Sequence, residues 1–248
     1  MISVVIPARN EEERLPRLLD TIDVARACFT GEVEVIVSDN ASTDSTAAVA
    51  SARGCLPAST PVRRIAAVRN AGAAVASGDL LVFVDADARI HPCTFSAIDT
   101  AMASGRFVGG ATGVEVDCRS LGLALTYAMI MPWVRALRMD TGPTFAARKD
   151  FEAIGGYDET MPYAEDVDFL LRLKRHGKND GRTLARLGTA RALFDTRKFD
   201  RYGDWHYLVM APRLLWWVLF NRKGTDPWFE RYWYGSGRGP SGSGDEER

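Results

Sequence analysis

The first hundred residues alternate between short apolar runs and segments whose apolar residues recur at helical spacing. The runs at 2–6, 33–37 and 80–84 indicate buried strands, and a weaker strand is expected at 62–66. Helical spacing lies between them, at 15–25, from about Thr43 to Arg53 behind a Ser42 cap, and in an alanine-rich stretch ending near Gly78. This alternation predicts an α/β fold with a mostly parallel central sheet and helices on both faces.

The second half of the chain is less regular. We expect a long apolar helix at 121–137, short strands within the glycine-rich 142–157, and a helix from about Ala164 to His176. Residues 199–234 contain twelve aromatic side chains, and 235–248 are rich in glycine, serine and charge. The last segment is therefore expected to be a flexible tail.

Charge and composition narrow the class of protein. With 31 basic and 32 acidic side chains the net charge is -1, which gives no global attraction for nucleic acid, so no such partner is expected. The apolar run at 120–134 is shorter than the roughly 18–20 residues that span a bilayer, and the chain opens on a strand rather than a leader. We expect a cytoplasmic protein with reduced core thiols at its four cysteines, Cys28, Cys55, Cys93 and Cys118.

Polar clusters follow each of the four expected strands. In open α/β sheets ligands bind along the edge where the strands end, so these clusters predict one ligand cleft. The chain has neither GxxxxGK[ST] nor a GxGxxG after its first strand, so a nucleotide bound here would rely on acidic groups and a metal. The clusters occupy residues 7–11, 39–44, 69–72 and 85–87.

Two carboxylates two residues apart, Asp85 and Asp87, end the fourth strand, where both can project to one side. Paired hard oxygen ligands suit a divalent cation that keeps several waters and shares a phosphate. The alternative interpretation is that the two aspartates cap loops and bind no metal, as an isolated pair of this kind often does. Asp39 could contact a nucleobase or cap a turn, and the sequence favours neither. Arg69 could contact a diphosphate or lie on a solvated helix face.

A second acidic pair, Glu165 and Asp166, opens the expected helix near residue 164. Acids at a helix N-terminus complement the macrodipole, and this is the simpler interpretation. The functional alternative is a general base, one carboxylate placed to accept a proton from an attacking hydroxyl.

Taken together, these residues resemble the inverting family 2 glycosyltransferases of the GT-A fold. The resemblance covers roughly residues 1–180 and consists of six motifs in the family's order and approximate spacing. They are Pro7-x-x-Asn10-Glu11, Asp39-Asn40-x-Ser42-Thr43-Asp44, Arg69-Asn70-x-Gly72, Asp85-x-Asp87, Gly155-Gly156-Tyr157-Asp158 and Glu165-Asp166.

The resemblance implies transfer of one sugar from a nucleoside-diphosphate donor, usually a UDP-sugar, with Mg²⁺ or Mn²⁺ and with inversion. It implies that Asp166, with Glu165 beside it, deprotonates the acceptor hydroxyl, and that Asp87 and Asp85 serve the metal. Nucleotide binding is implied for Pro7, Ala8, Asn10, Glu11, Asp39, Asn40, Arg69, Gly72, Asp85, Ala86 and Arg197.

The chain also departs from the family's pattern. The second acid often found beside the Asp39 equivalent is Asn40 here. The QxxRW motif of processive synthases is missing, so we expect a non-processive enzyme. None of the three histidines is clearly placed as a late metal ligand, and Arg197 or Lys198 could meet the diphosphate or belong to a solvated basic loop.

The resemblance suggests a division of the chain. Residues 1–200 would form the GT-A domain, with a nucleotide-binding half at 1–100 and an acceptor-binding half at 101–200. The aromatic and basic segment 201–234 would precede the tail 235–248. Basic charge beside tryptophan is typical of interfacial helices, so this segment could contact the inner membrane leaflet, which would suit a lipid-linked or cell-envelope acceptor. Packing over 121–137, or against a second subunit of a homodimer, is equally compatible with the pattern.

Two other functions stay open at this stage. A sugar-nucleotide nucleotidyltransferase shares the general sheet but usually carries a glycine-rich loop where this chain has Ala8-Arg9-Asn10-Glu11. A non-catalytic nucleotide-sugar-binding partner of a membrane complex would not need both an acidic metal pair and a candidate base.

Overall fold

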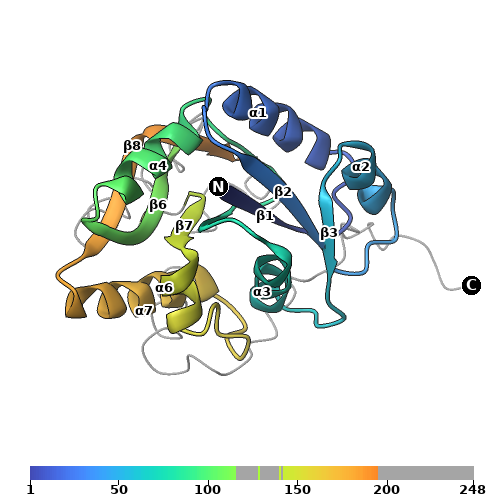
Figure 1. Cartoon of the computed structure of the whole chain (residues 1–248). Coiled ribbons are helices and arrows are strands. Elements are labelled where there is room, and N and C mark those ends of the chain that lie inside the picture. Colours follow the sequence, from blue (N-terminus) through green and yellow to red (C-terminus); the bar gives the residue numbers. More distant parts are fainter. Residues whose placement is uncertain (116–127, 129–139, 141, 195–248) are drawn as a thin grey trace, which may run out of the picture.

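The computed structural model describes residues 1–115, 128, 140 and 142–194. These residues form an eight-stranded sheet with helices on both sides (Figure 1). The strands are β1 (Ile2–Ala8), β2 (Val33–Asp39), β3 (Leu56–Ser59), β4 (Leu80–Phe83), β5 (Ala88–Arg89), β6 (Phe107–Glu115), β7 (Thr144–Ala147) and β8 (Thr183–Phe194). The helices are α1 (Leu15–Ala27), α2 (Thr46–Ala52), α3 (Ile65–Val75), α4 (Thr94–Ala103), α6 (Arg148–Ala153) and α7 (Glu165–Asn179).

The strand order is β3-β2-β1-β4-β7-β6-β8-β5. The first four of these strands are parallel, as the alternation of strands and helices predicts. Beyond them β7 is antiparallel to both β4 and β6, while β6 and β8 are parallel. The sheet is therefore mixed, with a parallel half built from the first 83 residues.

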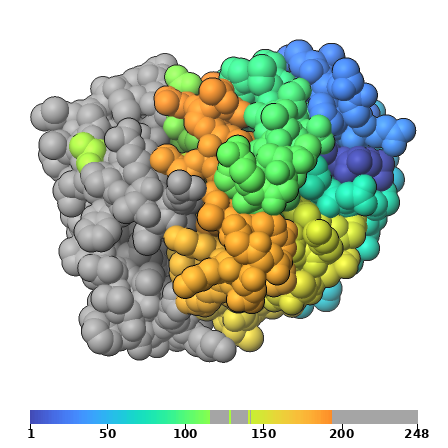
Figure 2. Space-filling model, turned by 60° about the vertical axis from the view of Figure 1, so that its left-hand side comes forward, coloured from blue at the N-terminus to red at the C-terminus, as the bar shows by residue number. Residues whose placement is uncertain are grey.

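Each face of the sheet carries its own apolar core. On one face Val4 and Ile6 pack with α1, α2 and α4; on the other Val5 packs with α3, α6 and α7. This alternation follows from the period-two geometry of a strand and explains why β1 is apolar throughout. Figure 1 shows the two helical layers on opposite sides of the sheet, and Figure 2 shows α4 lying against β8 at the surface.

The first strand continues through Pro7 to Ala8, beyond the end expected from the sequence. Val5 accepts a hydrogen bond from Val84 on the β4 side, whereas Ala8 accepts one from Asn40 on the β2 side. Because strand residues face alternate neighbours, Pro7 faces the β4 side, and the pairing with β4 has already ended at Val5. The missing amide of the proline therefore costs no ladder hydrogen bond.

Two expected elements need correction. The third strand is Leu56–Ser59 rather than 62–66, and α3 already begins at Ile65. Helix α2 begins at Thr46 rather than Thr43. Ser42 does not cap it; the Asp44 carboxylate accepts the Thr46 amide instead (3.0 Å).

The remaining expectations concern the helix near residue 164, the strands within 142–157, the cysteines and a possible membrane span. The helix near residue 164 is confirmed as α7, and 142–157 contains one strand, β7. Cys28, Cys55 and Cys93 are free, but Cys28 and Cys93 are exposed rather than in the core. Within the described residues, no helix combines the length and hydrophobicity that a bilayer crossing requires. The helix expected at 121–137, Cys118, Arg197, Lys198 and the segments 201–234 and 235–248 lie outside the described residues.

Candidate active site

A buried arginine joins two carboxylates that are far apart in the sequence. Arg69, on α3, is 7% exposed and donates from Nη2 to Oδ1 of Asp85 (2.8 Å) and from Nη1 to Oε1 of Glu165 (2.7 Å). Asp85 follows β4, and Glu165 is the first residue of α7. The guanidinium thus connects the parallel half of the sheet with the helix that carries the second acidic pair.

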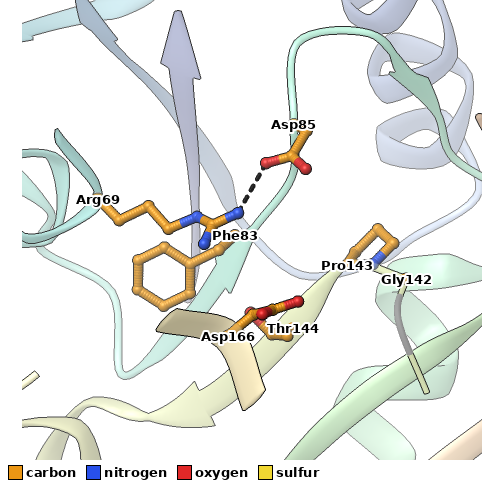
Figure 3. A pocket seen from close by; sticks show the side chains of 7 residues that line it. All are labelled: Arg69, Phe83, Asp85, Gly142, Pro143, Thr144 and Asp166. Atoms are coloured by element: carbon orange, nitrogen blue, oxygen red, sulfur yellow. Dashed lines mark hydrogen bonds and ion pairs between the residues drawn. The ribbon is translucent and has the colours of Figure 1, made fainter. Parts of the chain in front are cut away.

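A small pocket opens beside this arginine (Figure 3). Asp85 and Asp166 lie on different sides of it, and Arg69 lies at its wall. The structure therefore brings a candidate metal ligand and the candidate base to one space, as the sequence predicts. The lining residues are Arg69, Phe83, Asp85, Gly142, Pro143, Thr144 and Asp166.

The electrostatics of this site follow from burial and proximity. Burial raises the pKa of Glu165 to about 7; Arg69 opposes this rise, while Asp166 and Asp85 add to it. Burial would lower the pKa of Arg69, but the nearby carboxylates outweigh it and raise that pKa well above its usual range. The arginine is consequently a permanent positive charge between acidic groups.

An aromatic cluster of Phe83, Tyr157 and Phe169 packs next to Arg69, and Phe83 also lines the pocket. Tyr157 is 1% exposed, stacks on Phe169 with ring centroids 4.4 Å apart, and contacts the edge of Phe83 at 5.0 Å. Its hydroxyl lies 2.9 Å from Oγ1 of Thr144, and the guanidinium carbon of Arg69 lies 5.2 Å from its ring centroid. These aromatic contacts hold the ring of Tyr157 against the Arg69 guanidinium and so help to fix the position of the arginine.

Two of the six motifs meet through Asn70. Its side chain accepts from the amide of Tyr157 (2.9 Å) and donates to the carbonyl of the same residue (2.9 Å), as a neighbouring strand would. Gly156 has φ +67°, and a Cβ there would lie 2.7 Å from Oδ1 of Asn70. The glycine before Tyr157 is thus required by backbone conformation and by space.

The loops after β1 and β2, residues 9–12 and 42–46, are fastened to each other. We call them the rim loops. Asn10 and Ala41 adopt positive φ values of 54° and 53°, which turn the two loops toward each other. Their bonds run from the Asn10 amide to Ser42 Oγ (3.0 Å), from the Glu11 amide to Thr46 Oγ1 (2.8 Å), from the Thr43 amide to Asn10 Oδ1 (2.8 Å) and from the Ser45 amide to Glu12 Oε2 (2.9 Å). Asn10 therefore supports the rim through its side chain.

Asp39 and Asn40, at the end of β2, have different hydrogen-bond partners. Asp39 accepts from the amide of Ser42 (3.2 Å) and from its hydroxyl. Asn40 is 6% exposed and donates from Nδ2 to the carbonyls of Thr60 and Val62, both at 2.9 Å. A carboxylate has no proton to donate at neutral pH, so an amide suits this position where relatives often have an acid.

The remaining expected residues of the nucleotide site lie at strand ends or in packing positions. Pro7 and Ala8 end β1 next to Asp39, and Ala86 is buried between Asp85 and Asp87. Gly72 faces the sheet from α3, where a Cβ would lie 2.4 Å from Cγ1 of Val5. Its contribution in the structure is close packing of α3.

Residues 3–147 match the family described as Glycosyl transferase family 2. The chain belongs to this family. The match begins in β1 and ends with β7, so it includes Arg69 and Asp85 but stops before α7.

Two curated relatives of the family 2 chain are bacterial enzymes. The 4,4'-diaponeurosporenoate glycosyltransferase of Staphylococcus haemolyticus is 35% identical over 102 residues, which cover 36% of this chain and 25% of that protein. The undecaprenyl-phosphate 4-deoxy-4-formamido-L-arabinose transferase of Serratia proteamaculans is 35% identical over 99 residues, which cover 37% of this chain and 30% of that protein. The chain thus spans 25% to 30% of the length of these relatives.

The solved structures extend the likeness to most of the chain. Glucosyl-3-phosphoglycerate synthase from Mycobacterium tuberculosis, in complex with Mn²⁺, UDP-glucose and phosphoglyceric acid, gives a TM-score of 0.59 at 25% identity. The match covers 87% of this chain and 79% of that one. The family 2 chain therefore has the GT-A fold expected from its motifs.

The metal expected at the acidic pair can be tested against the donor set. The side chain of Asp85 is 40% exposed and uses Oδ1 for Arg69. Asp87 is partly buried two residues later, at the same strand end. Among residues 1–115 and 142–194, no three His, Cys, Asp or Glu side chains are grouped to hold an ion. These residues fit a hard cation that takes most of its ligands from water and a diphosphate, rather than a complete protein cage.

The sequence interpretation missed the supporting groups of the site. Asn70 and Tyr157 belong to the motifs that carry the resemblance, but no role was assigned to them. Thr144 lies in a stretch for which only short strands were expected. Their pairing depends on the contact between α3, β7 and the turn before α7, and no local pattern along the chain encodes that contact.

Proposed function

We propose that this chain is a metal-dependent, inverting and non-processive glycosyltransferase. It transfers one sugar from a nucleoside-diphosphate donor, a UDP-sugar, to an acceptor hydroxyl on a lipid-linked or cell-envelope glycan. The observation that carries this proposal is the pocket that Asp85 and Asp166 line together. Both acids belong to motifs that carry the resemblance described above, and they are 81 positions apart in the sequence.

In the proposed reaction Asp166 accepts the proton of the acceptor hydroxyl as its oxygen attacks the anomeric carbon. The attack comes from the side opposite the diphosphate, so one displacement inverts the anomeric centre and needs no enzyme-bound sugar. Asp166 lies at the N-terminus of α7, on the pocket side of the helix. A positioned carboxylate of this kind contributes typically 10²–10⁴-fold to such a step.

Donor binding is assigned to the opposite side of the pocket. Asp85 and Asp87 would hold Mg²⁺ or Mn²⁺, which would offset negative charge on the departing nucleoside diphosphate. Asp39 and the rim loops would receive the nucleoside, since they stand at the ends of β1 and β2. The UDP-glucose and Mn²⁺ of the mycobacterial synthase structure support this choice of donor and ion for the first assays.

The proposal is tested by removing each carboxylate in turn. Asp166→Asn should lower transfer at least 100-fold while leaving the affinity for UDP with Mn²⁺ within about twofold, because only the proton acceptor is lost. Asp87→Ala should abolish both transfer and Mn²⁺-dependent binding. The donor is chosen by thermal shift with a nucleotide-sugar panel, with and without Mn²⁺, because a bound donor raises the melting temperature.

The acceptor assay includes a polyprenol and a polyprenyl phosphate, since the name of one relative contains undecaprenyl phosphate. Asp180→Asn, at the exposed end of α7, is the matched control and should keep full activity. Near-normal turnover of both Asp166→Asn and Asp87→Ala would contradict the proposal. Donor binding without transfer or hydrolysis in the unaltered protein would favour a non-catalytic binding partner.

A further inference from the structure

Two neighbouring acids at the start of α7 face different surroundings. Asp166 lines the pocket, whereas Glu165 does not. The side chain of Glu165 is 11% exposed, and Oε1 accepts from Nη1 of Arg69. Glu165 therefore contacts Arg69 without lining the pocket that the substrates would occupy.

We propose that Glu165 is a positioning residue for the donor side of the site, acting through Arg69 on Asp85, and not a proton acceptor. The inference rests on the proposed function, because Asp85 is assigned there to the metal. It assigns separate tasks to the two acids: Asp166 acts on the acceptor, and Glu165 acts on the donor side through Arg69.

The geometry of a guanidinium explains how such an effect would be transmitted. Its donors are held in a fixed plane, so a bond at Nη1 also sets the direction of Nη2. In this structure Nη1 points to Glu165 and Nη2 points to Oδ1 of Asp85. The bond to Glu165 thus keeps Arg69 on one oxygen of Asp85 alone.

Loss of the Glu165 charge would change that balance. A glutamine would still offer Nη1 an amide oxygen, but an uncharged and therefore weaker acceptor than the carboxylate, while Nε already has no partner. Arginine binds carboxylates best through two parallel bonds, so the guanidinium would turn toward Asp85 and engage both of its oxygens. A cation would then have to compete with Arg69 for Asp85, and Mn²⁺-dependent donor binding would weaken.

The test measures donor binding and turnover separately in Glu165→Gln. Titration of UDP by calorimetry, at pH 8 where Glu165 is ionised, should give about tenfold weaker affinity in Mn²⁺ and unchanged affinity in EDTA. The turnover number for UDP-glucose, followed by transfer or by hydrolysis, should stay within about threefold of the unaltered protein at saturating donor.

Asp168→Asn is the matched control, because Asp168 is in the same first turn and pairs with a different arginine, Arg172, at 2.6 Å. It should bind Mn²⁺–UDP within twofold of the unaltered protein, which excludes a general effect of lost charge. Thermal unfolding of each variant checks that it is folded.

Unchanged Mn²⁺–UDP affinity in Glu165→Gln, or a turnover loss as large as that of Asp166→Asn, would overturn the inference and leave the proposed function intact. A structural role alone would lower the melting temperature without changing the Mn²⁺ dependence, and would overturn it as well. Failure of the unaltered protein to bind any nucleoside diphosphate with Mn²⁺ would instead reject the proposed function.

Discussion

At the scale of single residues, Asn40 shows how one atom type constrains a position. Its amide group donates to two carbonyls, of Thr60 and Val62, and so fixes the segment between β3 and α3 against the end of β2. A carboxylate in its place would put negative charge against two carbonyl oxygens. An aspartate at position 40 would therefore be disfavoured by this loop.

We predict that Asn40→Asp destabilises the protein at pH 7 at least as much as Asn40→Ala, which should cost about 1–3 kcal/mol for the two lost hydrogen bonds to the carbonyls of Thr60 and Val62. Once protonated, the introduced carboxyl group can donate one bond again, so the loss in Asn40→Asp should shrink at pH 4, unlike that in Asn40→Ala. Urea unfolding of both variants at pH 7 and pH 4 measures this. An equal pH response of the two variants would contradict the role of the amide.

Glu165 gives a second prediction at this scale, in the metal-free protein. Its pKa is raised by burial from about 4.5 to about 7 in the folded state, so the folded state retains the proton more tightly than the unfolded state does. Stability should therefore fall as pH rises from about 4.5 to about 7 and become level above that. Glu165→Gln lacks this component.

The measurement is the melting temperature in EDTA between pH 5 and pH 8. The melting temperature of the unaltered protein minus that of Glu165→Gln should fall by a few degrees from pH 5 to pH 8. Only the unaltered protein has to ionise a buried carboxyl group as the pH rises. A constant difference for Glu165→Gln would mean that the carboxyl ionises at its ordinary pKa.

At the scale of elements, α3 approaches the sheet more closely than a side chain would permit. A Cβ at Gly72 would lie 2.4 Å from Cγ1 of Val5 and 3.4 Å from Cβ of Ser38. Helix α3 carries Arg69, so its distance from the sheet also sets the position of the guanidinium.

We expect Gly72→Ala to destabilise the fold by about 1–3 kcal/mol through overpacking, despite the higher helix propensity of alanine. The double variant Val5→Ala/Gly72→Ala removes the methyl group that the new Cβ would meet. Its loss of stability should therefore be smaller than the sum of the losses in the two single variants, so the two effects should be non-additive. Gly188→Ala, where no atom lies within 4 Å of the new Cβ, should change stability by less than about 0.5 kcal/mol. Additive losses in the double variant would reject the contact as the cause.

Strands were predictable where they form continuous apolar runs and unpredictable where they are exposed or rich in glycine. Strands β1, β2 and β4 are continuous apolar runs because helices cover both their faces, and their pattern reveals them directly. Strand β3 has one buried residue in four and contains Pro57, so it carries no such pattern. Strand β6 contains three glycines, two of them where β7 and β8 approach too closely for a side chain, and therefore resembles a loop.

At the scale of the whole molecule, the site depends on contacts across long sequence separations. Arg69 and Glu165 are 96 positions apart, and the motifs indicated that both matter without indicating that they touch. Position at the strand ends was predictable from topology, because parallel strands end at one edge. The bonding of Arg69 was not, because it depends on how deeply α3 and α7 lie against the sheet.

The division of the chain near residue 200 falls outside the described residues and stays a prediction. We expect the full-length chain to cosediment with vesicles of anionic lipid, because basic and aromatic residues alternate in 201–234. A chain ending at Tyr202 should remain in the supernatant, and high salt should weaken the binding of the full chain. Equal sedimentation of both chains would favour packing of this segment against the protein or a second subunit.

The ends of the sheet have a consequence for self-assembly. In the described part of the fold the edge strands are β3, with four residues including Pro57, and β5, with two. At the β3 edge, the shortness of the strand and its proline offer few free backbone donors to an incoming chain, so this edge resists strand pairing between copies. Fibre growth from this part of the fold would therefore have to begin at the other side of the sheet, where β5 pairs with only two residues of β8.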